Sequence, residues 1–213
     1  MIEPKHFSGQ IGYWLSPLET DPLQPVWEEI SEFEATIPKD QPNGINNKFD
    51  LKRSRDVIAN IVAGHISRYN QENNWPNGLN VLGEARPLKL YNLWVNFMSK
   101  GQYEPIHDHG GVMSFVIWLR VPYTIASEAA ARPYVPPQFN TSGCFGLHSI
   151  NSMGRIQHTV LPVDKSWENV LCLFPAQMHH SVFPFYSSDE VRVSIAGNFF
   201  FDGAPEARIS NVN

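Results

Sequence analysis

The strongest constraint on the fold is a change in hydrophobic spacing part-way along the chain. Up to about residue 70, apolar residues recur every three or four positions, which predicts amphipathic helices. From about Leu88 to Phe201 they alternate with polar residues or form short apolar runs, which predicts strands. Two helices followed by about eight strands predict a mainly β, α+β domain: a β-sandwich or barrel with the helices packed on one sheet.

The expected elements follow from this spacing. Helices are predicted over about residues 23–33, where Pro38 limits the pattern, and 51–70. The predicted strands span residues 88–98, 113–121, 144–149, 156–161, 169–174, 179–185 and 191–201. We predict a single domain over residues 1–213, with a helical N-terminal support region over 1–80 and the β core over 86–203.

Composition excludes several classes of protein. The formal net charge of -5 argues against general binding to nucleic acids or anionic membranes. Two cysteines cannot form a disulfide framework. No secretory signal pattern is visible, and no apolar run approaches the roughly 18 residues of a membrane span. We therefore expect a soluble, cytoplasmic protein.

Four of the eight histidines lie in two short clusters. In an extended segment side chains alternate, so His107 and His109 face one side while Asp108 points away. By the same alternation, one member of the His179-His180 pair faces inward. Histidines in loops also serve as ordinary polar surface residues, so each cluster alone is weak evidence. Both clusters, however, lie beside apolar strands, and three converging imidazoles would form an open metal site of the catalytic kind.

The last predicted strand carries Arg192, Ser194 and Asn198 on one face. A solvent-exposed edge strand would explain the same residues, but the three phenylalanines at 199–201 favour a buried central strand. An inward-facing guanidinium is costly unless it meets an anion, and its planar fork matches a carboxylate. A metal together with an arginine-held carboxylate would grip a keto acid at two points.

In this order, the motifs resemble those of the Fe(II)/2-oxoglutarate-dependent oxygenases, and most of all a bacterial and phage branch related to the prolyl hydroxylases. The likeness covers roughly residues 88–201 and leaves the N-terminal helices without an assigned role. It is carried by His107-x-His109, Ser114-Phe-Val-Ile-Trp118-Leu, Phe174-Pro with His180-Ser-Val-Phe-Pro184, and Arg192-Val-Ser194 with Asn198.

The resemblance implies a double-stranded β-helix, or jelly roll, over the β core. It also implies an enzyme with Fe(II) as cofactor and 2-oxoglutarate as cosubstrate, a dioxygenase that hydroxylates an unidentified substrate and releases succinate and CO2. His107 and His180 would bind iron. Arg192, assisted by Ser194, would hold the far carboxylate of the cosubstrate.

One position departs from the family pattern, because His109 stands where the usual second ligand is a carboxylate. We predict His107, His109 and His180 as metal ligands, with Asp108 as the backup if a bulge re-aims it. Trp118 replaces a tyrosine that often binds the cosubstrate. The residues predicted to line the pocket are Trp94, Asn96, Trp118 and Asn198, with His148 and His158 as weaker candidates.

The sequence leaves other functions open. A cupin-type metalloprotein, a three-histidine zinc enzyme and a non-catalytic jelly-roll binding module would each use the same scaffold. The substrate, a small molecule or a peptide, is not identified, and the proline-rich segment 127–140 is expected to influence its selection. The sequence does not decide whether the protein forms a homo-oligomer.

Overall fold

The computed structural model describes residues 5–7, 10–37, 47–75, 86–151 and 153–204. Its strands are β1 (Lys5–Phe7), β2 (Gln10–Pro17), β3 (Asn47–Asp50), β4 (Leu88–Met98), β5 (Glu104–His107), β6 (Met113–Arg120), β7 (Phe145–Ile150), β8 (Ile156–Leu161), β9 (Val170–Pro175), β10 (His179–Val182) and β11 (Arg192–Phe201). Its helices are α1 (Gln24–Glu34), α2 (Arg55–Asn73) and α3 (Ile125–Ala131). None of these described helices is long and apolar enough to cross a membrane.

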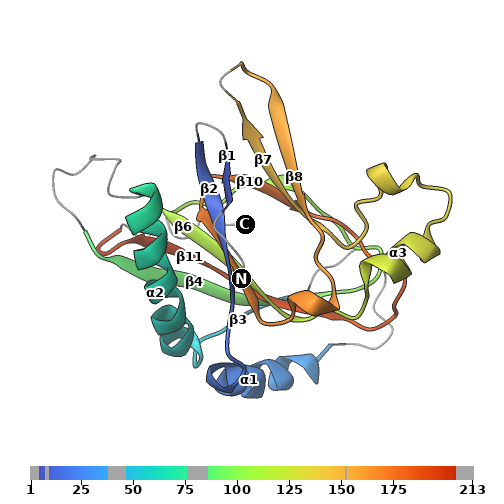
Figure 1. Cartoon of the computed structure of the whole chain (residues 1–213). Coiled ribbons are helices and arrows are strands. Elements are labelled where there is room, and N and C mark those ends of the chain that lie inside the picture. Colours follow the sequence, from blue (N-terminus) through green and yellow to red (C-terminus); the bar gives the residue numbers. More distant parts are fainter. Residues whose placement is uncertain (1–4, 8–9, 38–46, 76–85, 152, 205–213) are drawn as a thin grey trace.

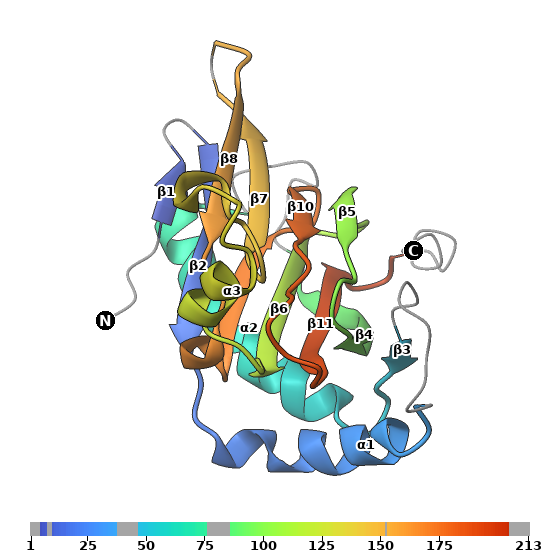
Figure 2. The same cartoon turned by 90° about the vertical axis from the view of Figure 1, so that its right-hand side faces the viewer.

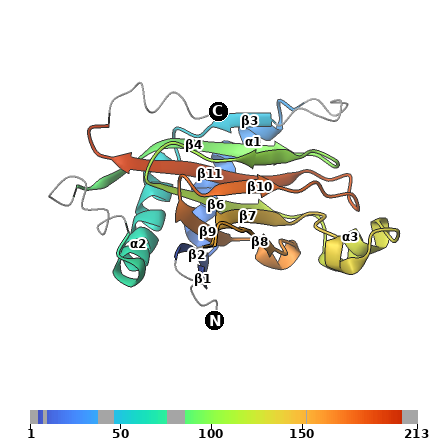
Figure 3. The same ribbon diagram turned by 90° about the horizontal axis from the view of Figure 1, so that it is seen from above.

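The strands form two antiparallel sheets that face one another (Figures 1 and 3). The larger sheet has the order β1-β2-β9-β6-β11-β4-β3, and the smaller has the order β5-β10-β7-β8. Along much of the β core, the chain alternates between the two sheets, as in β4, β5 and β6 and again in β9, β10 and β11. This arrangement is the double-stranded β-helix, so the predicted fold class is confirmed.

Two apolar cores sandwich the larger sheet. Between the two sheets, Trp118 and Phe174 pack with Phe145 from the smaller sheet. On the opposite face, α1 and α2 pack residues such as Ile30 and Ile58 against the sheet, and Figures 1 and 2 show both helices on that side. Strand β6 is buried along nearly its whole length because both faces are covered, as its continuous apolar run predicts.

The predicted and observed elements agree best where the spacing of apolar residues within the segment is regular. Strands β4 and β8 have the predicted bounds, and β7, β9, β10 and β11 lie within a few residues of them. The sequence analysis did not predict β1, β2, β3, β5 or α3. Strand β2 pairs with β9 and strand β3 with β4. The N-terminal region thus contributes strands as well as helices, and these strands depend on partners far away in sequence.

The carboxylate of Glu29 ties α1 to the start of α2. Its Oε1 accepts hydrogen bonds from the backbone N–H groups of Lys52 and Arg53, at 2.8 and 3.1 Å. Its Oε2 accepts from the backbone N–H and the hydroxyl of Ser54, at 2.8 and 2.7 Å. The side chain is 4% exposed. A buried anion that satisfies the N–H groups of the turn leading into α2 stabilises the packing of both helices on the sheet.

We expect Glu29→Gln to lower the free energy of unfolding by about 2 kcal/mol. The amide carries no negative charge, and its NH2 group would face the N–H and hydroxyl donors that the carboxylate binds. Burial raises the pKa of Glu29, but hydrogen bonds from Ser54 and the neighbouring backbone hold it below its ordinary value. The stabilisation is therefore present above the unfolded-state pKa and is lost as pH falls through the lower folded-state pKa. Urea unfolding at neutral and acidic pH measures both effects. Glu32→Gln, which removes an exposed ion pair to Arg53, should change stability by less than about 0.5 kcal/mol.

Candidate active site

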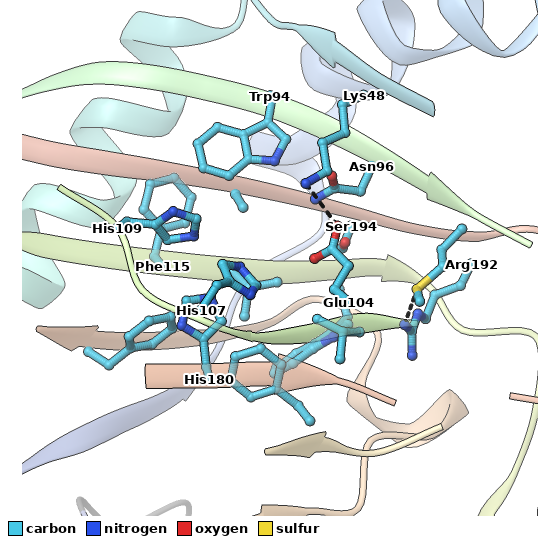
Figure 4. A pocket seen from close by; sticks show the side chains of 17 residues that line it. Lys48, Trp94, Asn96, Glu104, His107, His109, Phe115, His180, Arg192 and Ser194 are labelled. Atoms are coloured by element: carbon cyan, nitrogen blue, oxygen red, sulfur yellow. Dashed lines mark hydrogen bonds and ion pairs between the residues drawn. The ribbon is translucent and has the colours of Figure 1, made fainter. Parts of the chain in front are cut away.

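Three histidines converge at one end of the space between the sheets. His107 ends β5, His109 lies in the loop that follows, and His180 lies on β10, where its Cα is paired with that of His107. One ligand nitrogen from each lies within 4.8 Å of the other two, and Figure 4 shows the labelled side chains close together. His180 is buried and His179 is exposed, as strand alternation predicts.

Backbone carbonyl groups orient two of the three rings. The Nδ1 of His107 lies 2.7 Å from the carbonyl oxygen of Pro105, and the Nδ1 of His180 lies 3.0 Å from that of Met178. An Nδ1–H that donates to a carbonyl leaves the Nε2 lone pair free for a metal. The buried Nδ1 of His109 has no hydrogen-bond partner in the part of the chain that the structure describes. This donor set fits a metal ion such as iron, which would also relieve the cost of the unpaired nitrogen.

The imidazoles of His180 and His109 favour their neutral, metal-binding form. Burial, together with the neighbouring His107, lowers the pKa of His180 to about 3. Burial likewise lowers the pKa of His109 to about 4, again with a contribution from His107. Uncharged rings can donate lone pairs to a cation at neutral pH. Asp108, the backup ligand, is exposed and lies outside the three-histidine group.

The three histidines open into a cavity whose lining includes five aromatic side chains, Trp94, Phe115, Trp118, Phe145 and Phe174. Of the residues predicted to line a pocket or bind the cosubstrate, Trp94, Asn96, Trp118, Arg192 and Ser194 line this cavity. Asn198, which was also predicted to line it, does not. It is fully buried further along β11, where its Oδ1 accepts a hydrogen bond from the Ser114 hydroxyl at 2.5 Å.

The weaker candidates His148 and His158 also lie outside the cavity. They are direct partners on β7 and β8, and their rings stack with centroids 4.4 Å apart. Leu147, the neighbour of His148, is fully buried and belongs to the core between the sheets. Because strand neighbours point to opposite faces, both histidines lie on the outer face of the smaller sheet.

Arg192 stands at the other end of the cavity from the histidines (Figure 4). Its side chain is 2% exposed. Its Nη1 donates to the Tyr123 hydroxyl at 2.7 Å and to the Gly143 carbonyl at 3.2 Å, and its Nη2 contacts the Met98 sulfur. None of these partners is an anion. A buried guanidinium whose hydrogen-bond partners are neutral favours the binding of an anionic group beside it.

Sequence reasoning missed two charged residues of the cavity, Lys48 and Glu104. Lys48 Nζ lies 2.8 Å from Glu104 Oε1, and their side chains are 44% and 16% exposed. Burial raises the pKa of Glu104, but Lys48 holds it below its ordinary value, so the carboxylate is ionised at neutral pH. Proximity to His107 in sequence could have pointed to Glu104. Lys48 has no local signal, since only the pairing of β3 with β4 brings it there.

The proline-rich segment 127–140 lies elsewhere. Its first part belongs to α3, and Pro137–Phe139 form a short 3-10 helix. The segment lines a separate surface groove through Arg132, Val135, Phe139 and Asn140, and none of its residues is among those that line the metal cavity. Its expected influence on substrate selection would therefore have to act through this groove.

Comparisons with known proteins agree with this fold and site. Residues 92–198, half of the chain, match a family model described as "Putative 2OG-Fe(II) oxygenase". No curated protein matches the chain. A prolyl-4-hydroxylase from Pseudomonas putida superposes with a TM-score of 0.54 at 13% identity, covering 92% of this chain and 95% of its own. A prolyl hydroxylase from Trichoplax adhaerens gives a TM-score of 0.55 at 13% identity, covering 95% and 87%.

A non-heme carbocyclase, SnoK from nogalamycin biosynthesis, is similar at a TM-score of 0.58 and 11% identity, covering 97% of this chain and 88% of its own. At such identities these structures establish the fold alone. Fold and site define a jelly-roll protein with an open three-histidine centre. With the family match, the chain belongs to the Fe(II)/2-oxoglutarate-dependent oxygenases, enzymes whose cofactor is Fe(II) and whose cosubstrate is 2-oxoglutarate.

Proposed function

We propose that this protein is a dioxygenase that hydroxylates a small-molecule or peptide substrate and converts 2-oxoglutarate to succinate and CO2. One observation carries the proposal. Three histidine nitrogens within 4.8 Å of one another stand at one end of a cavity, and a buried arginine whose hydrogen-bond partners among the described residues are neutral stands at the other. A keto acid with a second carboxylate matches this pair of groups in both chemistry and polarity.

The chain's own residues bind and orient the reactants. His107, His109 and His180 would hold the iron, which when bound supplies the oxygen activation that is coupled to decarboxylation of the cosubstrate. Arg192 would bind the far carboxylate, with the Ser194 hydroxyl beside it. Three neutral ligands leave the full charge of the metal uncompensated, and this favours a dianionic cosubstrate.

The aromatic wall of the cavity excludes water from the reacting groups. Trp94 stands close to the centre, with its ring centroid 5.7 Å from that of His109. Phe174 and Phe145 lie on the other side, at 5.0 and 5.6 Å from the His180 ring. A dry, low-dielectric wall strengthens the attraction between the metal centre and anionic ligands.

The substrate is proposed only as a class. Similar structures include a prolyl hydroxylase in complex with a peptide fragment of hypoxia inducible factor and an epimerase, SnoN, in complex with nogalamycin RO. The fold therefore serves both peptides and small molecules in other proteins, which supports leaving both classes in the proposal.

Purified protein supplied with Fe(II), oxygen and 2-oxoglutarate is expected to form succinate slowly without any added substrate. Carbon-13 NMR of labelled 2-oxoglutarate measures this uncoupled turnover. A candidate substrate should increase the rate and gain one oxygen atom by mass spectrometry. One equivalent of tightly bound zinc, with no exchange for iron and no succinate, would instead support a hydrolytic three-histidine zinc enzyme.

A further inference from the structure

Two side chains of opposite charge meet inside the metal cavity. Lys48 comes from β3, at one edge of the larger sheet, and Glu104 comes from β5, at one edge of the smaller sheet. Lys48 Nζ lies 2.8 Å from Glu104 Oε1, and Figure 4 draws this ion pair within the cavity. The pair therefore joins the two sheets across the space that also contains the proposed metal ligands.

The Glu104 carboxylate stands in the path of the proposed cosubstrate. Figure 4 shows it between His107, at the metal end of the cavity, and Arg192, at the other end. Its side chain is only 16% exposed, so water screens its charge poorly. A dicarboxylate that extended from the metal ligands to Arg192 would meet a fixed negative charge and would be repelled by it.

Lys48 is placed to offset that repulsion. Among the described residues that line the cavity, Lys48 and Arg192 are the two with a permanent positive charge. The Arg192 guanidinium is held by Tyr123, Gly143 and Met98. Lys48 is 44% exposed and carries its ammonium on a flexible stem, so it can exchange one carboxylate for another at little cost.

We propose that Glu104 occupies the place of a ligand carboxylate before the cosubstrate binds, and that Lys48 changes partner when it does. The entering dicarboxylate pairs with Lys48, and the Glu104 side chain turns away from the cavity. This inference rests on the proposed function. It adds Lys48 as a second cation for the cosubstrate beside Arg192, and it makes Glu104 a competitor for the same site.

The test is a calorimetric titration of 2-oxoglutarate into Mn(II)-loaded protein without oxygen. Glu104→Gln should tighten binding by about three- to tenfold, because the competing charge is gone and Lys48 is free. Lys48→Gln should weaken binding by about tenfold or more, because the ligand loses its partner and the Lys48 ammonium no longer offsets the charge of Glu104. The double variant should remain weaker than the wild type.

The double variant decides between two roles of Lys48. If it binds 2-oxoglutarate as tightly as the wild type or more tightly, Lys48 only neutralises Glu104 and the change of partner is wrong. Weaker binding by Glu104→Gln alone would also contradict the proposal. Lys100→Gln is the matched control, because Lys100 is 46% exposed and pairs with Asp189 on the surface. It should leave the affinity unchanged. Thermal unfolding and Mn(II) affinity verify that each variant is folded.

Succinate separates this inference from the proposed function, since it is a dicarboxylate without a keto group and needs the cations of the cavity but no chelation. Succinate binding with the same dependence on Lys48 and Glu104, in a protein that does not bind 2-oxoglutarate, would overturn the cosubstrate assignment and keep the partner change. Binding of neither compound, by the wild type or by Glu104→Gln, would overturn both.

Discussion

Replacing His180 with alanine is expected to abolish metal binding, with a loss of affinity of at least about 100-fold. Mutating a residue that hydrogen-bonds a metal ligand already lowers metal affinity by about 10- to 100-fold, and removing the ligand itself lowers it more. His180 is buried, and its Nδ1 lies 3.0 Å from the Met178 carbonyl. Among the described residues, the group of possible metal ligands has no fourth member that could replace it. Competition with a fluorescent chelator for Fe(II) or Co(II) measures the affinity.

The chain provides a matched control at the next position. His179 is the same type of residue on the same strand but is exposed, so His179→Ala should change metal affinity by less than about twofold, as expected for a surface residue. If His179→Ala abolished binding and His180→Ala preserved it, the assignment of the inward-facing ligand would be reversed. Asp108→Asn should likewise have little effect, because the carboxylate is exposed and outside the three-histidine group.

Arg192→Ala is expected to weaken 2-oxoglutarate binding by about 100-fold or more, because truncation of one partner of a buried charge pair typically costs 2–5 kcal/mol. Metal affinity should be unchanged, since Arg192 stands at the other end of the cavity from the histidines. Calorimetric titration of Mn(II) into the metal-free protein measures the metal affinity, and titration of 2-oxoglutarate into the Mn(II)-loaded protein measures the cosubstrate affinity. The variant thus distinguishes loss of the cosubstrate site from loss of the metal.

Arg120→Ala serves as the control for this experiment. Arg120 is the last residue of β6 in the larger sheet, just as Arg192 is the first residue of β11. It pairs with Glu34 of α1 and does not line the cavity. It should reduce stability by no more than about 1 kcal/mol and leave cosubstrate affinity intact. Unchanged binding of 2-oxoglutarate by Arg192→Ala would exclude Arg192 as its carboxylate partner.

Much of the site could be predicted because it depends on strand parity. The alternation that turns His180 inward and brings Arg192 and Ser194 to one face is local, so it can be recognised in a single sequence. His109 lies in the loop after β5, so strand alternation does not explain its position. Asn198 shares the parity of Arg192 but lies too far along β11 to reach the cavity. Strand alternation predicts the face on which a side chain lies, but it does not predict how far along the strand the cavity extends.

The remainder of the fold and site depends on non-local pairing. Strands β2 and β3 extend the larger sheet by pairing with β9 and β4, which the spacing of their own short segments does not reveal. Lys48 enters the cavity only because β3 pairs in this way, and its ion pair with Glu104 crosses from one sheet to the other. Such contacts follow from topology, so the charged pair of the cavity could not be predicted from motif spacing.

The most direct test of the central claim is optical. Fe(II) is added to the purified protein without oxygen, followed by 2-oxoglutarate, and the visible spectrum is recorded. A keto acid that chelates Fe(II) produces a metal-to-ligand charge-transfer band, and we predict this band for the wild type and its absence for His180→Ala and, at moderate cosubstrate concentration, for Arg192→Ala. No band at saturating 2-oxoglutarate, in protein that has bound iron, would contradict the account.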